Sequence, residues 1–417
     1  MLLNICQTCN ITTFFELLIS RRNGLACTNC NGKVEELWSL GNLPPSDTFC
    51  PSKQEALDCY TERLAVGICH SCGLIQNVKI VDEQVRYTDT DYSYNSANSS
   101  VALKHWTEYA EFITEIAPKK DNLKILEIGS NDGFCANAVK SLNPSAIVVG
   151  LDASGTQVES ARSAYPECHF SQCVFGREND KYESKYFDIV FANNVVNHSN
   201  QLSGFLARTR ELLTDNGIFV FEVPSTDVAF LNGKWDQIYH EHVSYFTINS
   251  IDHILCMNGF QVLDMKIVDF HGGSIRVVCG KRDPKIKLKY NYNLVHYRNN
   301  VSNLRSIADK QKEIIKKIIQ KVPDGVHFYL FGAPAKGVTL INYCELSFVE
   351  VQGCLESSQS KIGKYIPKAG IPILNENEVV SGSVVFNLIW NLPHLFDSFC
   401  RKHNLIGVDY ENYSDFA

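Results

Sequence analysis

The chain contains 417 residues, which predicts roughly three domains at about 150 residues per domain. Hydrophobic residues make up 45% and charged residues 20% of the chain, so it can bury enough apolar surface to fold, which excludes a wholly disordered protein. The formal net charge of −7 argues against a protein that binds nucleic acid by neutralising phosphates over its whole surface. Because no run of about 18 apolar residues occurs and the first residues lack a signal-peptide pattern, we expect a cytoplasmic protein without a membrane partner.

Six of the sixteen cysteines form three Cys-x-x-Cys pairs near the N-terminus, which are Cys6/Cys9, Cys27/Cys30 and Cys69/Cys72. Such a pair presents two thiolates on one tight turn, and two pairs together make a tetrahedral zinc site with no open position, hence a structural one. The spacing allows the second pair to combine with the first or with the third. A redox-active pair would need a βαβ context that this segment lacks, and plain buried thiols are the other alternative.

The middle of the chain alternates short apolar runs with longer amphipathic stretches, after a helix that is predicted to begin near residue 101. The runs are KILEI (124–128), IVVGLD (147–152), DIVFA (188–192) and IFVFEV (218–223). This alternation predicts βαβ units and a parallel sheet. A lysine-rich linking helix is predicted over 301–322, and a second, shorter α/β pattern begins at residue 327.

The segment KILEIGSNDGF (124–134) predicts a strand, a glycine turn and the start of a helix. It lacks the third glycine of the dinucleotide-binding fingerprint, and its acidic side chains would repel a phosphate. An acidic strand end instead suits a cationic or zwitterionic ligand, such as the amino-acid half of S-adenosylmethionine. Cofactor binding is therefore assigned to Glu127, Gly129, Asn131, Asp132 and Gly133.

The following strands end in polar side chains that extend this predicted cofactor site. Asp152 ends the second strand, where a carboxylate can accept both ribose hydroxyls; the alternative is that it caps the next helix. The loop SQCVF (171–175) is expected to contact adenine. Asn194 and His198 follow the run DIVFA, and ligands of open parallel sheets bind beyond such strand ends. A histidine satisfied in the core is the alternative for His198.

The segment WDQIYHEHVSYF (235–246) concentrates groups that transfer protons. Its histidines are two residues apart, unlike the HExxH zinc motif, which places both on one helical face. A loop could present Tyr239, Glu241 and His242 together, with the histidine as general base, the carboxylate orienting it and the hydroxyl stabilising an enolate oxygen. A polar surface turn and a second metal site are the alternatives. His271 precedes a later predicted strand, at the same ligand edge.

Taken together, these segments resemble the zinc-containing, S-adenosylmethionine-dependent nucleotide-sugar C-methyltransferases of deoxysugar biosynthesis. The resemblance extends over nearly the whole chain from Cys27, and the number and order of the motifs make it specific. The matching segments are CTNC…LGNLPPSDTF, ICHSCGLIQ (68–76), ILEIGSNDGF, NNVVNHSN, IYHEHVSYF, HGGSIRVV, FGAPAKGVTLINY (331–343) and KIGKYIPKAGIPIL (361–374).

The resemblance implies an α/β fold with a small N-terminal four-cysteine zinc domain, a central class I methyltransferase (Rossmann-like) domain and a C-terminal Rossmann-like domain. It favours one set of ligands for structural Zn²⁺: Cys27, Cys30, Cys69 and Cys72. The role of Cys6 and Cys9 stays unassigned. The predicted boundaries are 1–26 for an N-terminal extension, 27–86 for the zinc domain, 87–280 for the methyltransferase domain, 281–322 for the linker helix and 323–417 for the C-terminal domain.

The resemblance also implies roles for individual residues. His242 is the expected base, with Glu241, Tyr239 and His198 around it. Tyr94 and Ser96 are expected near the cofactor, in a segment that departs here from the family's usual SxTSxT-like ending.

The implied reaction is carbon methylation. The base would remove an acidic proton from C3 or C5 of a 4-keto sugar, and the resulting enolate would take the methyl group of S-adenosylmethionine. The expected substrate is a nucleotide-sugar, in its dTDP-linked form by analogy with the family, and no nucleic-acid partner is expected. An O- or N-methyltransferase of another small molecule, and a binding protein that keeps the fold without activity, are the alternatives.

Overall fold

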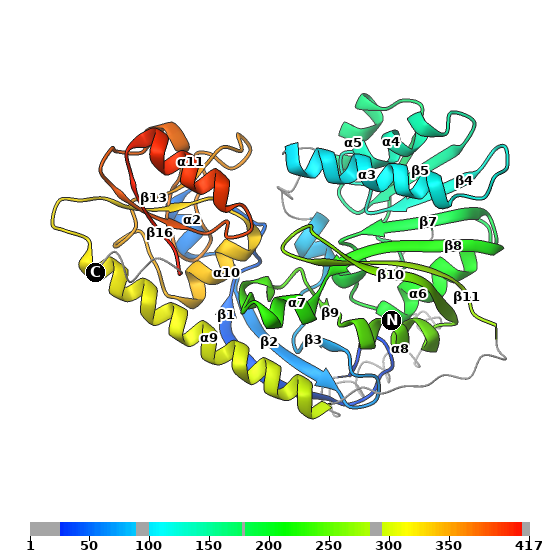
Figure 1. The fold of residues 1–417 in the computed structure, drawn as a ribbon, viewed down its shortest axis with the longest axis horizontal. Helices are drawn as coiled ribbons and strands as arrows, with labels where there is room; N and C mark the ends of the chain where they lie inside the picture. The colour runs from blue at the N-terminus through cyan, green and yellow to red at the C-terminus, as the bar shows by residue number, and fades with distance from the viewer. Residues whose placement is uncertain (1–25, 89–99, 177–179, 284–293, 411–417) are drawn as a thin grey trace, which may run out of the picture.

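The computed structural model describes residues 26–88, 100–176, 180–283 and 294–410, which fold around three β-sheets (Figure 1). The predicted α/β architecture of a zinc-binding module, a methyltransferase sheet and a C-terminal α/β module is confirmed. Cys6 and Cys9, and the predicted cofactor residues Tyr94 and Ser96, lie outside the described residues. Within the described ranges, no helix combines the length and the hydropathy that a bilayer-crossing segment needs.

The first sheet is antiparallel and has the strand order β1-β2-β3-β9. Its strands are β1 (Val34–Leu43), β2 (Glu62–Cys69), β3 (Ile75–Asn77) and β9 (Ser244–Tyr245). The short helix α2 (Lys53–Leu57) lies between β1 and β2, and the π-helical turn η1 (Gln84–Thr88) follows β3. Because β9 directly follows the Tyr-His-Glu-His segment, the N-terminal sheet is completed by a strand next to the predicted catalytic residues.

The second sheet has seven strands in the order β10-β11-β8-β7-β4-β5-β6. Five of them are parallel: β4 (Lys124–Ile128), β5 (Ile147–Asp152), β6 (His169–Gln172), β7 (Phe187–Asn193) and β8 (Leu213–Pro224). The hairpin of β10 (Phe260–Val268) and β11 (Ser274–Lys281) adds two antiparallel strands beside β8. The chain order reverses on either side of β4, and ligands of open α/β sheets bind at such a switch point.

Helices cover both faces of this sheet because its parallel strands are buried on both sides. One face carries α3 (Ser100–Ile116), α4 (Phe134–Leu142) and α5 (Gly155–Ala164). The other carries α6 (Leu202–Leu212) and α8 (Ile248–Met257), with the shorter η2 (Val196–His198), α7 (Thr226–Leu231) and η3 (Trp235–Gln237) in the connecting loops. Cys27, Cys69 and Cys72 pack in the same apolar cluster as α6 and α8, so the zinc module rests on this second face.

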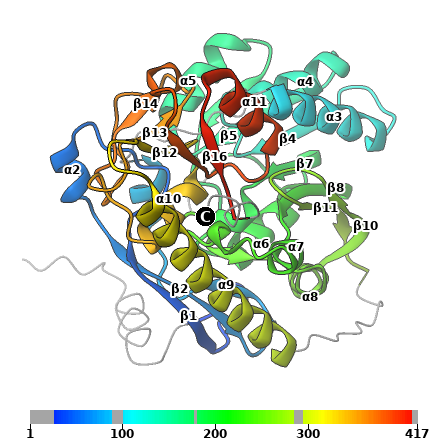
Figure 2. The ribbon, with the colours of Figure 1, turned by 60° about the vertical axis from the view of Figure 1, so that its left-hand side comes forward.

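The third sheet is parallel, with the order β14-β13-β12-β15-β16. Its elements are β12 (Phe328–Phe331), α10 (Ala335–Tyr343), β13 (Gly353–Glu356), β14 (Ile373–Asn375), η4 (Glu376–Glu378), β15 (Val384–Asn387), α11 (Pro393–His403) and β16 (Ile406–Val408). The long helix α9 (Leu294–Lys321) leads into it and lies along β1 and β2 (Figures 1 and 2). As the apolar spacing predicts, α9 buries Leu304, Ile314 and Ile318, while Lys316 and Lys317 stay exposed.

Three aromatic rings join the modules beside the predicted catalytic loop. Trp38 of β1 lies 6.2 Å from Trp235 of η3 and 5.8 Å from Tyr343 of α10, and the latter two rings are 4.9 Å apart. The indole N–H of Trp235 also donates to Gln311 of α9 at 2.7 Å. The three sheet modules and the linking helix therefore meet at one packed junction, directly before the predicted catalytic segment.

Candidate active site and metal centre

The four cysteines of the second and third pairs converge on one point. The sulfur atoms of Cys27, Cys30, Cys69 and Cys72 all lie within 4.8 Å of one another, with Cys27–Cys72 at 3.6 Å and Cys30–Cys69 at 3.4 Å. Thiolates ~2.3 Å from a central Zn²⁺ stand roughly 3.8 Å apart, so the cluster fits a tetrahedral ion with no open position. In the described ranges, no other three or more His, Cys, Asp or Glu side chains come close enough together to share a metal ion, so the histidines of the alternative second metal site do not belong to such a group.

The metal centre is tied to the predicted catalytic loop through β3. The Gln76 carboxamide oxygen accepts the Thr28 N–H at 2.9 Å, which fixes the turn between Cys27 and Cys30. The neighbouring Asn77 donates its backbone N–H to the Val243 carbonyl at 2.9 Å and its side-chain amide to the Tyr239 carbonyl at 3.2 Å. The side chain of Asn77 is fully buried, so these bonds hold the loop against the zinc module without competition from water.

The predicted cofactor residues gather at the carboxyl ends of β4 and β5. Gly129 has φ +72°, and a side chain there would collide with Val195, so this turn needs glycine. The Asp152 carboxylate accepts the N–H of Asn131 and the N–H of Ser154, both at 2.8 Å. The cap of α5 is the Ser154 hydroxyl, so Asp152 braces two loops rather than capping the helix.

Unsatisfied oxygens surround this edge, which is what a bound cationic cofactor needs. Glu127 is 4% exposed and its Oε2 has no hydrogen-bond partner among the described residues. The carboxamide oxygens of Asn193 and Asn194 are likewise buried and without a partner in that part of the chain. Burial, helped by the Asp132 carboxylate, raises the pKa of Glu127 well above its ordinary value. These hydrogen-bond acceptors suit the ammonium group and the positively charged sulfonium of S-adenosylmethionine.

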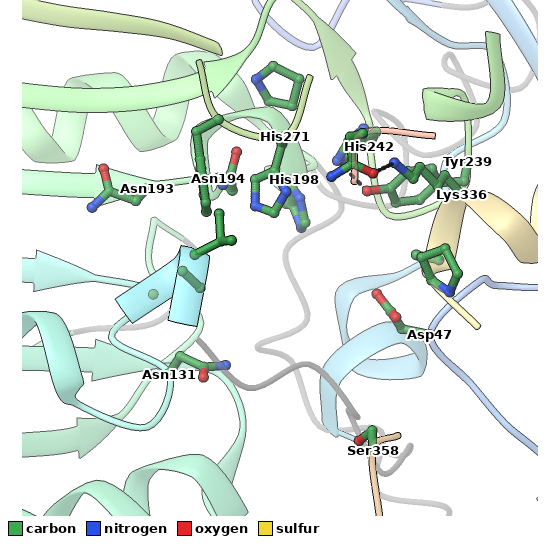
Figure 3. Close-up of a pocket in the computed structure, with 18 of the residues that line it drawn as sticks. Asp47, Asn131, Asn193, Asn194, His198, Tyr239, His242, His271, Lys336 and Ser358 are labelled. Atoms are coloured by element: carbon green, nitrogen blue, oxygen red, sulfur yellow. Dashed lines mark hydrogen bonds between the residues drawn. The ribbon is translucent and has the colours of Figure 1, made fainter. Parts of the chain in front are cut away.

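A cavity of about 1660 Å³ connects this edge with the C-terminal module (Figure 3). The predicted adenine loop contributes Cys173, Val174 and Phe175 to its lining. Figure 3 shows the asparagines on one side of the cavity and Tyr239, Lys336 and Asp47 on the other, with His198 between them. The cavity is large enough for two sizeable ligands side by side, since drug-sized ligands occupy pockets of roughly 300–1,000 Å³.

The predicted proton-transfer segment forms a tight turn that brings Tyr239 and His242 together. The His242 N–H donates to the Tyr239 carbonyl at 3.1 Å, and the Tyr239 hydroxyl lies 2.6 Å from His242 Nε2. His242 Nδ1 lies 3.0 Å from the carbonyl oxygen of Gln237, which can only accept, so Nδ1 carries the proton and Nε2 the lone pair. Burial lowers the pKa of His242 to about 3, which keeps the ring neutral.

Glu241 is placed differently from the predicted orienting role. Its Oε1 accepts the N–H of Ser46 at 2.8 Å and that of Asp47 at 3.3 Å, so it points toward the zinc module. The ring of His242 is oriented instead by the Gln237 carbonyl. The turn directs adjacent side chains to opposite sides, which residue types alone do not reveal.

His198 lies beside this pair, with its ring centroid 5.1 Å from that of His242. Its Nδ1 lies 2.6 Å from the Tyr87 hydroxyl, and its buried Nε2 has no partner in the described part of the chain. Burial, followed by the neighbouring His242 and Arg86, lowers the pKa of His198 well below its ordinary value. The alternative of a satisfied core histidine therefore does not describe it, because one ring nitrogen has no hydrogen-bond partner among the described residues.

Several cavity residues were missed by the sequence analysis. Asp47 enters from the loop after β1, and Lys336 from the first turn of α10. Burial lowers the pKa of Lys336 to about 8, and its ammonium lies 3.7 Å from the ring centroid of Trp390. Asn193 precedes the predicted Asn194. In the sequence, the PPSD and GAPAKG segments stand out only as parts of the family-like stretches. Their approach to the cavity depends on how the three domains pack, which the sequence pattern does not show.

His271 lies at the predicted ligand edge, in a turn with φ +53°. Burial lowers its pKa to about 3. The next residue, Gly272, is packed so closely under Trp390 that a side chain there would collide with the indole. The C-terminal module is therefore held against the central one at the rim of the cavity.

Three family models match the chain in the order of its three sheets. The model described as "Putative zinc binding domain" matches residues 27–87, "Methyltransferase domain" matches 103–265, and "C-methyltransferase C-terminal domain" matches 269–404. Together they span the zinc cluster, the cofactor edge and both walls of the cavity.

The chain is also similar to individual proteins over all or part of its length. "C-methyltransferase NovU" of Streptomyces niveus is 24% identical over 381 residues, which cover 87% of this chain and 89% of that protein. "Ubiquinone biosynthesis O-methyltransferase" of Rhodopseudomonas palustris is 33% identical over 116 residues, 27% of this chain and 42% of that protein. The solved structure of the PH0226 protein from Pyrococcus horikoshii OT3 has a TM-score of 0.38 at 15% identity and covers 46% of this chain and 95% of its own.

The order of the matched domains, the full-length similarity to a C-methyltransferase and the four-cysteine cluster agree with one another. The chain is an S-adenosylmethionine-dependent methyltransferase with the domain composition of the zinc-binding C-methyltransferases.

Proposed function

We propose that the protein methylates C3 or C5 of a nucleotide-linked 4-keto-deoxysugar through an enolate. The observation that carries the proposal is the pair of Tyr239 and His242 in the wall of a cavity that also contains the cofactor edge. An O- or N-methyltransferase needs no base aimed at a carbon acid, whereas His242 has its Nε2 lone pair held ready beside a phenol.

The two side chains have complementary parts in the proposed reaction. When the keto sugar enters, the Tyr239 hydroxyl turns from His242 Nε2 to the carbonyl oxygen, and Nε2 removes the proton from the adjacent carbon. The electron pair of that C–H bond moves into the enolate, whose oxygen the phenol stabilises by a hydrogen bond. S-adenosylmethionine, when bound, supplies an electrophilic methyl group, and a new C–C bond forms as the carbon–sulfur bond breaks. The Gln237 carbonyl stabilises the imidazolium by accepting from Nδ1.

The C-terminal module supports a nucleotide-sugar as the substrate. Its side of the cavity carries Lys336, Lys361 and Lys402, next to the serine-rich loop 357–360. Glu356, at the end of β13, accepts the N–H groups of Ala333, Ser357 and Ser358 and so shapes both loops around the opening. Lysines beside a strand-end loop suit a diphosphate, and the remaining volume suits a nucleoside.

The decisive experiment follows the proton rather than the product. The purified enzyme is incubated with dTDP-, UDP- and GDP-linked 4-keto-6-deoxysugars in D2O without S-adenosylmethionine, and the sugar is examined by NMR and mass spectrometry. We expect deuterium at the carbon that becomes methylated once the cofactor is added. Methyl transfer to oxygen or nitrogen, or cofactor binding with no turnover of any keto sugar, would contradict the proposal and favour one of the alternatives.

A separate prediction concerns the cofactor and pH. Because the pKa of Glu127 is raised in the free protein, its carboxyl stays protonated to a higher pH than an ordinary glutamate. A cationic cofactor binds the ionised carboxylate better than the protonated carboxyl. The Kd for S-adenosylmethionine is therefore expected to fall as pH rises through that pKa, with proton release measurable by calorimetry in buffers of different ionisation enthalpy. Glu127→Gln should bind more weakly and lose the pH dependence. The same pH dependence in Glu127→Gln would show that another group is responsible.

A further inference from the structure

Two parallel sheets of the same strand order contribute to the one large cavity. The parallel strands of the central sheet lie in the order β8-β7-β4-β5-β6, and those of the C-terminal sheet lie in the order β16-β15-β12-β13-β14. The chain order reverses at β4 in the first sheet and at β12 in the second, so each sheet has a ligand-binding edge at that point. Both edges line the cavity, with Asn131 at the first and Ser358 at the second (Figure 3).

The two edges share the same backbone contact at a glycine turn. Gly129, after β4, donates its N–H to the carbonyl of Leu151 at 2.7 Å. Gly332, after β12, donates its N–H to the carbonyl of Leu355 at 2.8 Å. Each leucine directly precedes the acidic residue that ends its strand. Both glycines have left-handed φ angles, +72° and +85°, so the two turns begin in the same way.

The two strand-end acids also have equivalent hydrogen bonds. Asp152 accepts one N–H from its glycine turn and one from the residue two positions further along the chain. Glu356 does the same with Ala333 at 3.0 Å and Ser358 at 3.1 Å. A carboxylate has about four acceptor positions, so each acid can still accept from a hydroxyl of a ligand in the cavity. Because Asp152 is expected to bind the ribose of the cofactor, the equivalent place of Glu356 suits a second pentose.

The charges of the two edges are opposite. Two residues before the first glycine, the central sheet has the buried acid Glu127, whereas the equivalent position before the second glycine is the buried, apolar Leu330. Lys336 lines the cavity at the second edge, and the ammonium of Lys361 donates to the Ala333 carbonyl in the glycine turn at 2.9 Å. The helix α10 begins there without a side-chain cap, so the N-terminus of its dipole adds positive potential. This edge therefore suits an anion and not the cationic cofactor.

We propose that the C-terminal edge binds the nucleoside diphosphate of the substrate, with Glu356 accepting from a pentose hydroxyl and Lys336 and Lys361 pairing with the diphosphate. The inference rests on the proposed function and deepens it, because it gives the nucleotide half of the substrate a site of its own. The cofactor then occupies the β4 edge and the nucleotide the β12 edge. The keto sugar lies between them, where Tyr239 and His242 line the same cavity.

The test measures nucleotide binding by calorimetry in the zinc-loaded full chain, saturated with S-adenosylhomocysteine so that the cofactor edge is already occupied. The probes are UDP and dTDP, each compared with its 2′,3′-dideoxy analogue, which lacks every pentose hydroxyl that Glu356 could bind. In the wild type we expect each parent nucleotide to bind about tenfold or more tightly than its analogue, the effect of one hydrogen bond to a charged group. In Glu356→Gln the difference should fall to about threefold or less, because the acceptor is then neutral.

Two further variants separate the pentose from the diphosphate. Lys361→Met should weaken the binding of all four nucleotides by a similar factor, because it removes a charge near the diphosphate and not a pentose contact. The matched control is Glu350→Gln, which changes an exposed carboxylate of the same module that accepts the Ser347 N–H at 3.1 Å outside the cavity. It should keep both the affinities and the difference between parent and dideoxy nucleotides.

The comparison of parent and dideoxy nucleotides in the wild type remains a test if Glu356→Gln does not fold. Equal affinities in the wild type, or a full difference in Glu356→Gln, would overturn the assignment of Glu356. No binding of any of the nucleotides, or a second equivalent of S-adenosylhomocysteine that UDP displaces, would overturn the site as a whole. Nucleotide binding with the expected dependence on Glu356, but no deuterium exchange with any keto sugar, would instead reject the proposed reaction and leave the nucleotide site in place.

Discussion

Replacing His242 with asparagine is expected to lower kcat by about 10²–10⁴-fold, the contribution of a positioned general base. Asparagine is close in size and can still donate to the Gln237 carbonyl, but it cannot accept a proton from a carbon acid. Because His242 belongs to the turn after η3 and not to the β4–β5 edge, the Kd for S-adenosylmethionine should change little. The measurement is single-turnover methyl transfer together with calorimetric cofactor binding.

A control separates the loss of the base from a general effect of removing a histidine. His169→Asn alters an exposed histidine at the start of β6 and should retain wild-type kcat. Deuterium exchange into the sugar should disappear in His242→Asn even without cofactor, since that reaction isolates the proton transfer. Turnover and exchange at wild-type rates in His242→Asn would show that another group removes the proton.

Much of the fold could be predicted because its signals are local. The alternation of apolar runs and amphipathic stretches predicts a parallel sheet, and β4, β5, β7 and β8 all include the runs that the sequence shows. The spacing of the cysteines predicts a zinc site, although it leaves the pairing open. The structure brings together the pairs Cys27/Cys30 and Cys69/Cys72. The spacing of the cysteines alone could not predict this choice, because it depends on how the chain packs.

The site could be predicted only in part because it is built across modules. Tyr239 and His242 are close in sequence, and one turn suffices to join them. Asp47, Arg86 and Lys336 reach the same cavity or its histidines from segments far apart in the chain. Their positions depend on how three sheets pack, and that information is carried by many apolar contacts such as the Trp38–Trp235–Tyr343 junction.

The pairing of β9 with β3 is the clearest example of this nonlocal information. Ile75 pairs with Tyr245 across about 170 residues of chain, and two residues give too short a strand to be read from sequence. The consequence is functional, since β9 begins two residues after His242. The zinc module therefore holds one end of the catalytic loop through the pairing of β3 with β9 and is not structurally independent of it.

From this connection follows the second large effect: loss of zinc should abolish turnover while much of the cofactor edge survives. Structural Zn²⁺ supplies ~10–16 kcal/mol in small zinc-binding peptides, and the four clustered cysteines here have few other ways to be satisfied. In Cys72→Ala the turn before β3 loses its anchor, so the bonds from Asn77 to Val243 and Tyr239 are weakened. We expect a lower thermal midpoint and a loss of kcat of at least about 10²-fold, since misplacement of a catalytic group by ~1 Å has that effect.

The comparison of cofactor binding with turnover distinguishes this coupling from simple unfolding. At a temperature below its midpoint, Cys72→Ala should still bind S-adenosylmethionine, because the cofactor edge lies at the ends of β4, β5 and β7, which pair with one another in the central sheet. Cys59→Ser is the matched control, as Cys59 is a half-buried cysteine outside the cluster, and it should keep its zinc and its activity. If a chelator removes the metal and leaves both the thermal midpoint and kcat unchanged, the zinc module does not hold the catalytic loop. If cofactor binding is lost in step with turnover, the metal stabilises the whole chain instead of positioning His242.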